Sequence, residues 1–166
     1  MIQPTISGIQ AKSTKSLGTD SSREGGIIMP NLMEVMRHEV KAVPHTSPIS
    51  EAAQQMKIWR VSALLVKHNH DFVGIITDTD IVRKGVAETK DLSGITVASI
   101  MTTPFITIDS QHSPREAQQM MADSGVRHLV VRQGQAITGI VSMRDLLVFS
   151  QHAGEAKYAE PKIGVD

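Results

Sequence analysis

The segment Gly74-Ile75-Ile76-Thr77-Asp78-Thr79-Asp80 returns 65 residues later as Gly139-Ile140-Val141-Ser142-Met143-Arg144-Asp145. Two units of about 60 residues therefore fill the chain from roughly residue 29 to residue 151. A unit of this size cannot bury its apolar face alone, so the copies are expected to pack about a pseudo-two-fold axis and to build any pocket twice. The same offset also pairs Met36 with Met101, Met56 with Met121, Val61 with Val126, and Leu64 with Leu129.

The first unit predicts a strand, a helix, two further strands and a closing helix. Apolar residues recur at helical spacing from Ile49 to Trp59, which predicts an amphipathic helix. The two apolar runs that follow are rich in β-branched residues and predict a hairpin. Asn69 in their connection matches Gly134 of the second unit, and both residue types tolerate positive φ. The predicted elements are a strand near 41–43, a helix at 49–59, strands at 63–66 and 72–76, and helices from Asp78 and Met143.

These elements predict an α/β fold of two β-α-β-β-α repeats, assigned to residues 29–94 and 95–154. Residues 1–28 are rich in Ser, Thr, Gly and Gln and have no hydrophobic period. Such a segment buries too little apolar surface to offset its chain entropy, so we expect it to be disordered. Residues 155–166 include Pro161 and Gly164 and are expected to form a loosely ordered tail.

Composition narrows the class of protein. The 17 basic and 17 acidic side chains give a net charge of zero, which argues against duplex nucleic acid as a partner. The longest apolar stretch, residues 61–66, is far shorter than the roughly 20 residues of a membrane span. The absence of cysteine excludes disulfides and cysteine-held metals. We expect a cytoplasmic protein that contacts neither nucleic acid nor membrane.

In both copies of the opening motif, a hydroxyl and a carboxylate three residues apart straddle the predicted start of a helix. Thr77 precedes Asp80, and Ser142 precedes Asp145. One interpretation is a capping box, in which the pair satisfies the free amides of the helix. The other is a ribose site, because a carboxylate can accept both hydroxyls of a cis-diol while the helix N-terminus attracts a phosphate. The duplication and the strand-to-helix context favour the ribose site.

The tandem pattern resembles a pair of CBS domains, the repeat first named from cystathionine β-synthase. The resemblance rests on residues 61–66 and 74–80 and on their counterparts 126–131 and 139–145. It covers about three quarters of the chain, and the ordered set occurring twice makes it specific. A pair of these repeats, called a Bateman module, typically binds adenosine-containing ligands and dimerises into a flat disc of four repeats.

The resemblance implies two clefts, each built from both repeats. Base contacts in this family come largely from backbone groups, so the identity of the side chains there matters little. The first cleft is expected to contain Thr77 and Asp80 for the ribose, with Val126, Arg127, His128 and Ile106 around the base and phosphate. The second is expected to contain Ser142 and Asp145 for the ribose, with Lys41, Val61, Ser62, Ala63 and Arg144.

The two copies differ in charge. Arg144 precedes Asp145, whereas its counterpart in the first repeat is the neutral Thr79. Arg127 and His128 stand where the first repeat has Ser62 and Ala63. Because the planar guanidinium suits phosphate, the phosphate ends of the two clefts are expected to differ. The alternative is that Arg144 lies on a solvated helix face and that Arg127 and His128 lie at a strand edge.

Other candidate sites carry less weight. His68, His70 and Asp71 could suggest a metal, but they lie in one predicted turn without a fourth ligand, so no metal site is expected. The methionines are expected to pack the core and interfaces. Trp59 is expected to be a core or dimer contact rather than a stacking platform. No nucleophile elbow, Walker loop or paired acid-base carboxylates occur, so no catalytic residue is assigned and an enzyme is not expected.

The leading hypothesis is a stand-alone regulatory module that binds AMP, ADP or ATP and modulates an unidentified partner protein. No catalytic cofactor is expected, and the nucleotide is the regulatory ligand. A second hypothesis keeps the clefts but changes the ligand to NAD(H) or S-adenosylmethionine, because the motif recognises only the ribose. A third is a ligand-free dimerisation scaffold, which the two intact motifs disfavour. The apolar pairs Ile81-Val82 and Leu146-Leu147 predict self-association as a homodimer.

Overall fold

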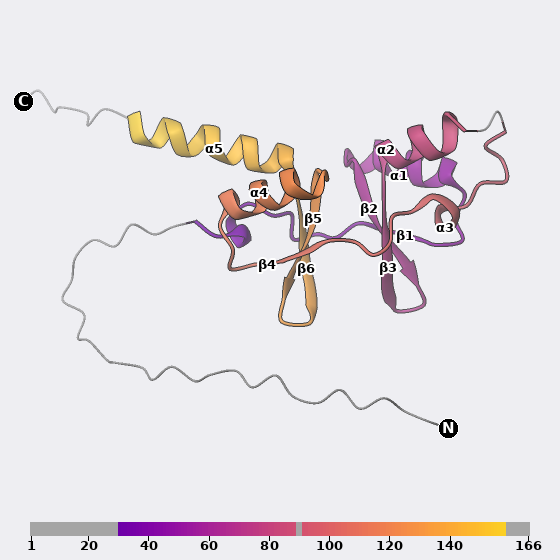
Figure 1. Cartoon of the computed structure of the whole chain (residues 1–166), viewed down its shortest axis with the longest axis horizontal. Helices are drawn as coiled ribbons and strands as arrows, with labels where there is room; N and C mark the ends of the chain where they lie inside the picture. Colours follow the sequence, from indigo (N-terminus) through magenta and orange to yellow (C-terminus); the bar gives the residue numbers. More distant parts are fainter. Residues whose placement is uncertain (1–29, 89–90, 159–166) are drawn as a thin grey trace, which may run out of the picture.

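The computed structural model describes residues 30–88 and 91–158 (Figure 1). The segment 1–28, expected to be disordered, lies outside the described residues, as do residues 159–166. The last helix continues to Tyr158, four residues into the stretch that the sequence assigns to the tail. Ala and Lys in that stretch favour helix, and a single glycine at 154 costs only about 1 kcal/mol, so the helix continues through it.

Each repeat forms a three-stranded sheet and the two sheets have the same topology. In each, the first strand pairs in parallel with the second, which pairs antiparallel with the third. The helices lie on one side of the view in Figure 1 and the hairpin turns on the other. The predicted α/β class is therefore confirmed. The first repeat contains β1 (Ala42–Pro44), α1 (Ile49–Trp59), β2 (Ala63–His68) and β3 (Asp71–Thr77); the second contains β4 (Thr107–Asp109), α4 (Pro114–Ser124), β5 (His128–Gln133) and β6 (Ala136–Ser142).

The predicted local signals are found where the pattern placed them. Asn69 and Gly134 take φ of 55° and 61° in the two hairpin turns. On α1, Ile49, Ala52 and Met56 are buried, as the helical spacing predicts. These agreements confirm the hairpins and the amphipathic helix of the sequence interpretation.

The closing helices of the two repeats differ in geometry. In the first repeat, α2 (Asp78–Asp80) continues as a π-helix, η2 (Ile81–Val86). The Ala87 N–H donates to the Val82 carbonyl, five residues earlier, at 2.9 Å, which is the hydrogen-bond spacing of a π-helix. In the second, α5 (Met143–Tyr158) is an α-helix throughout. Gly85 is buried, and a Cβ placed on it would meet Ile49 Cδ1 at 3.0 Å. The missing side chain thus lets η2 approach α1 closely.

The repeats exchange their leading segments. Arg37, which begins the first repeat, pairs with Ile140 on β6 of the second, and Thr102 pairs with Ile75 on β3 of the first. The short helices η1 (Leu32–Glu34) and α3 (Val97–Ile100) accompany these segments into the opposite repeat's core. Each core is therefore completed by the leading segment of the other repeat.

Glycines allow this exchange because the crossing segments lie directly on the strands. A Cβ on Gly139 would meet Met36 Sδ at 2.7 Å and the Arg37 carbonyl at 2.8 Å. A Cβ on Gly74 would meet Met101 Sδ at 2.7 Å. The paired glycines and methionines of the repeat pattern thus mark where the leading segments cross.

A third apolar cluster joins the two sheets. Residues of β2 alternate between the first repeat's core and this central cluster, so four successive positions of β2 are buried. Burial on both faces explains the continuous apolar run that the sequence shows there. The central cluster is formed by Ala63, Leu65, Ile75 and Val130.

Candidate ligand-binding clefts

Two clefts lie between the repeats, one at each hydroxyl-and-carboxylate motif. We call them the Asp145 cleft and the Asp80 cleft. The Asp145 cleft has a volume of about 630 Å³ and the Asp80 cleft about 260 Å³. Small-molecule sites usually span roughly 300–1,000 Å³, so only the Asp145 cleft already has the volume for a whole nucleotide. Among others, Ser62, Ser142, Arg144 and Asp145 line the Asp145 cleft, and Thr77, Asp80, Ile106 and Val126 line the Asp80 cleft.

The structure brings together every residue that the sequence placed in each cleft. All thirteen lie in the cleft to which they were assigned, while Arg127 and His128 line both. Their role in binding stays a prediction. The Asp145 cleft contains Lys41, Val61, Ser62, Ala63, Ser142, Arg144 and Asp145, and the Asp80 cleft contains Thr77, Asp80, Ile106, Val126, Arg127 and His128.

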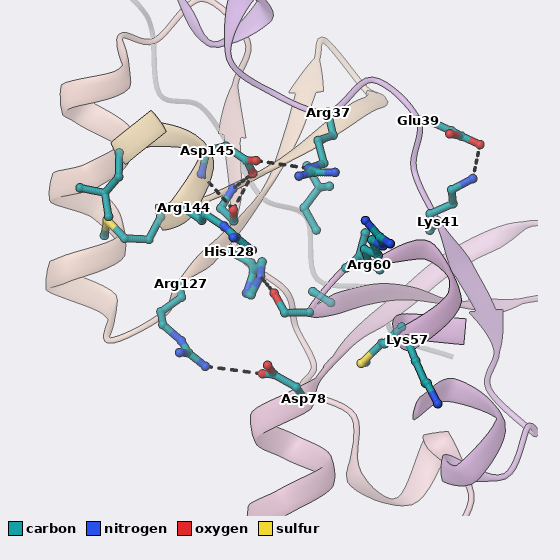
Figure 2. Close-up of a pocket in the computed structure, with 18 residues that line it drawn as sticks. Arg37, Glu39, Lys41, Lys57, Arg60, Asp78, Arg127, His128, Arg144 and Asp145 are labelled. Carbon is teal, nitrogen blue, oxygen red and sulfur yellow. Dashed lines mark hydrogen bonds and ion pairs between the residues drawn. The ribbon is translucent and has the colours of Figure 1, made fainter. Parts of the chain in front are cut away.

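Asp145 is held by a capping box at the start of α5. Its Oδ2 accepts hydrogen bonds from the Ser142 amide at 2.9 Å and from Ser142 Oγ at 2.5 Å. Its Oδ1 accepts one bond, from Arg37 Nε at 3.2 Å (Figure 2). A carboxylate has about four acceptor positions, and the described residues fill three of them, which leaves one for a further donor such as a ribose hydroxyl.

Asp80 is held by the equivalent capping box but is more fully engaged. Its Oδ2 accepts bonds from the Thr77 amide at 3.0 Å and Thr77 Oγ1 at 2.7 Å. Its Oδ1 lies 2.7 Å from Lys84 Nζ and 3.2 Å from Thr102 Oγ1. All of its roughly four acceptor positions are therefore occupied. A ribose could bind this carboxylate only if Lys84 or Thr102 released it.

The charge state of Asp80 reflects these partners. Burial alone raises the pKa of Asp80, but hydrogen bonds from Lys84 and Thr77 and the positive charge of Lys84 outweigh burial and lower it. The carboxylate is thus ionised at neutral pH and acts as an acceptor, not as an acid. At Asp145 the capping and ribose interpretations are compatible, because Oδ2 caps the helix while Oδ1 keeps an acceptor position.

Arg127 and His128 form a wall shared by the two clefts. Arg127 Nη2 donates to Thr79 Oγ1 at 2.6 Å and lies 3.5 Å from Asp78 Oδ1, which ties the second repeat to the first. His128 Nε2 lies 2.9 Å from Ser62 Oγ. Burial is the main cause that lowers the pKa of His128, so this ring is neutral at pH 7.

Sequence reasoning missed several basic residues of the Asp145 cleft. Arg37 reaches the cleft only because the leading segments are exchanged, which no local pattern indicates. Lys57 and Arg60 end the first helix, and a signal for Arg60 was present: the offset of 65 places it opposite Gly125. Both positions take left-handed φ, 53° at Arg60 and 64° at Gly125.

The remaining candidates have structural surroundings. Trp59 packs against the first repeat's core, and Lys41 Nζ lies 5.0 Å from the centre of its ring. The His68 ring lies 4.2 Å from that of His45. No group of three His, Cys, Asp or Glu in residues 30–88 and 91–158 could hold a metal ion. Nor does any helix of those residues have the length and apolar character to cross a membrane.

The family comparison agrees with this architecture. The CBS domain profile matches residues 32–87 and again residues 97–152. The chain belongs to the CBS domain family. Its two CBS repeats correspond to the two sheets, and the first match includes the leading segment that packs into the second repeat.

Relatives of this CBS pair include proteins from bacteria and archaea. An uncharacterized protein of Methanopyrus kandleri is 33% identical over 116 residues, which are 69% of this chain and 59% of that protein. The CBS domain-containing protein YhcV of Bacillus subtilis is 30% identical over 120 residues, 72% of this chain and 85% of YhcV. The hexameric CBS-CP12 protein from bloom-forming cyanobacteria superposes with a TM-score of 0.70 at 25% identity, covering 83% of this chain and 80% of that one.

Proposed function

We propose that this CBS pair is a regulatory module that binds adenine nucleotides in the clefts between its repeats and modulates a partner protein. The observation that supports it best is Asp145, a capped carboxylate with one free acceptor position in a cleft of nucleotide size. Basic side chains line the same cleft, so a ribose hydroxyl and a phosphate can be held in one cavity. The module acts as a sensor because a ligand that prefers one conformation shifts the population toward it.

Calorimetric titration with AMP, ADP and ATP tests this function. The wild type is expected to release or absorb heat with at least one of them, and the Asp80→Asn, Asp145→Asn double variant to lose that signal. The amide keeps the shape of the side chain, and thermal unfolding checks that the variant still folds. Absence of a signal with every adenosine compound would exclude the proposal.

NAD(H) is a second candidate ligand, favoured over S-adenosylmethionine by the basic surroundings of Asp145. Arg144 and Arg127 suit a pyrophosphate better than a sulfonium. Thermal-shift competition distinguishes the ligands, since each raises the melting temperature according to its occupancy. A larger shift with NADH than with any adenine nucleotide would reassign the ligand.

We also propose that the module acts as a homodimer whose assembly surrounds the clefts. One protein of similar structure, the CBS-CP12 protein from bloom-forming cyanobacteria, is a hexamer. In this chain, exposed apolar residues on the closing helices of both repeats support self-association. The partner protein that the module regulates would then meet an assembly whose shape depends on ligand.

A further inference from the structure

The two clefts differ in charge, because basic residues of the Asp145 cleft have neutral counterparts in the other repeat. Six basic side chains line the Asp145 cleft, and one of them, Arg127, is shared with the Asp80 cleft. The other five have neutral counterparts 65 residues away, so the duplication has kept the motif and changed its charge. The pairs are Arg37 and Thr102, Lys41 and Ile106, Lys57 and Ala122, Arg60 and Gly125, and Arg144 and Thr79.

Three of these cations are already neutralised within the cleft. Arg37 pairs with Asp145, Lys41 with Glu39, and Arg127 with Asp78. In the part of the chain that the structure describes, no ion-pair partner is found for the other three. The residues that line the cavity therefore carry three more positive than negative charges, and the cations without an ion pair are Lys57, Arg60 and Arg144.

The Asp80 cleft has no such surplus. Its carboxylate is neutralised by Lys84, and the guanidinium of Arg127 lies beside Asp78. The third titratable group on its wall, His128, is neutral at pH 7 because burial lowers its pKa. The excess of positive charge is thus confined to the larger cleft.

Arg60 is a second, independent indication. It occupies a left-handed backbone conformation with φ of 53°, at the end of α1, where the second repeat has glycine. Side chains other than glycine are disfavoured there, so the arginine carries a backbone cost that the glycine of the second repeat avoids. Figure 2 shows Arg60 and Arg144 reaching the cavity from opposite sides, from the two repeats, while the Lys57 ammonium points away from both.

We propose that the Asp145 cleft selects adenosine di- and triphosphates over AMP, with Arg60 and Arg144 as the residues that determine this specificity. The inference rests on the proposed nucleotide binding and names the ligand class of its larger cleft. A single phosphate offers one phosphoryl group to two arginines on opposite walls, whereas a longer phosphate chain carries more negative charge and offers a phosphoryl group to each arginine. Guanidinium groups suit such a chain because each can donate two parallel bonds to phosphate oxygens.

The test compares adenosine, AMP, ADP and ATP by calorimetric titration in magnesium-free buffer. For the wild type, ADP and ATP are expected to bind at least about tenfold more tightly than AMP, the factor that one charge-assisted contact supplies. The Arg60→Gln, Arg144→Gln double variant is expected to lose at least about tenfold in ATP affinity and less than about threefold in AMP affinity. Asp145→Asn is expected to lower the affinity for AMP, ADP and ATP alike.

Arg83→Gln and Arg115→Gln are the matched controls. Both side chains are exposed and neither lines a cleft, so each change removes one positive charge without touching the proposed site. They are expected to leave the ATP affinity within about twofold, the small effect of a distant, screened charge. AMP binding as tight as ATP, or an unchanged ATP affinity in the double variant, would overturn the specificity and leave nucleotide binding intact. Failure of every adenosine compound to bind would overturn both proposals.

Discussion

Arg60 gives the clearest prediction at the scale of a residue, because its backbone strain and its proposed role can be separated. Replacing Arg60 with glycine relieves a left-handed conformation that costs roughly 1–2 kcal/mol. Part of this gain is offset by the larger entropy of glycine in the unfolded chain. We expect the melting temperature, measured calorimetrically without nucleotide, to rise by about 2–4 °C for each kcal/mol gained.

The reciprocal change provides the control. Gly125→Ala places a side chain at φ of 64° in the second repeat, where space is open but the backbone is unfavourable, and should lower the melting temperature. A lower melting temperature for Arg60→Gly would mean that the arginine holds the fold, and its place in the cleft would need no ligand to explain it.

His128 predicts a pH dependence of stability. Burial and the nearby Arg127 lower its pKa in the folded state, although Asp78 and Asp145 oppose this. The unfolded chain, with an ordinary histidine pKa of about 6.5, then binds more protons than the folded one, so the free energy of unfolding rises with pH in this region. The contribution is complete above pH 6.5 and is lost as pH falls toward the folded pKa. Urea titrations at several pH values between 5 and 7.5 give the free energy of unfolding as a function of pH. Its rise with pH should be smaller for His128→Gln than for the wild type. Equal slopes would contradict the assignment.

At the scale of elements, most of the fold is predictable because its signals are local. The spacing of apolar residues on α1, the turn residues Asn69 and Gly134, and the capping boxes at residues 77 and 142 each act within a few neighbours. The exchange of η1 and α3 is not predictable in this way, since Arg37 pairs with Ile140, 103 positions away, and Ile75 pairs with Thr102, 27 positions away. Arg37 escaped the sequence interpretation of the cleft for the same reason, because its partner Asp145 lies in the other repeat.

Gly139 provides a test of the exchanged segment. A methyl group there would meet Met36 Sδ and the Arg37 carbonyl below 3.0 Å, so Gly139→Ala should displace the leading segment from β6. Overpacking of this kind costs about 1–3 kcal/mol, to be measured by urea unfolding. Gly94→Ala is the matched control, because a Cβ at Gly94 meets nothing within 4 Å. Equal stability of the two variants would argue that the leading segment does not pack on β6.

At the scale of the whole molecule, the duplication repeats the scaffold but not its surface. The cores are equivalent, whereas the clefts differ in charge and volume and the closing helices differ in geometry. The sequence predicted self-association through the apolar pairs Ile81-Val82 and Leu146-Leu147. Only one residue of each pair is exposed. Ile81 and Leu146 turn into the two cores, while Val82 and Leu147, related by the offset of 65, are 58% and 52% exposed.

A substitution at Val82 therefore tests whether the closing helices form the dimer interface. Together with Val86, it presents an apolar surface on η2, and Leu147 and Val148 present a similar one on α5. Exposed apolar residues on equivalent helices are the kind of surface that self-association buries. Light scattering at micromolar concentration is expected to give the mass of two chains, and Val82→Asp to shift it toward one, because burying an unpaired carboxylate is costly. Gln135→Asp, at the exposed hairpin turn directed away from the helices in Figure 1, adds the same charge and should leave the dimer unchanged. A monomeric wild type, or equal dissociation by both substitutions, would show that these helices do not form the interface.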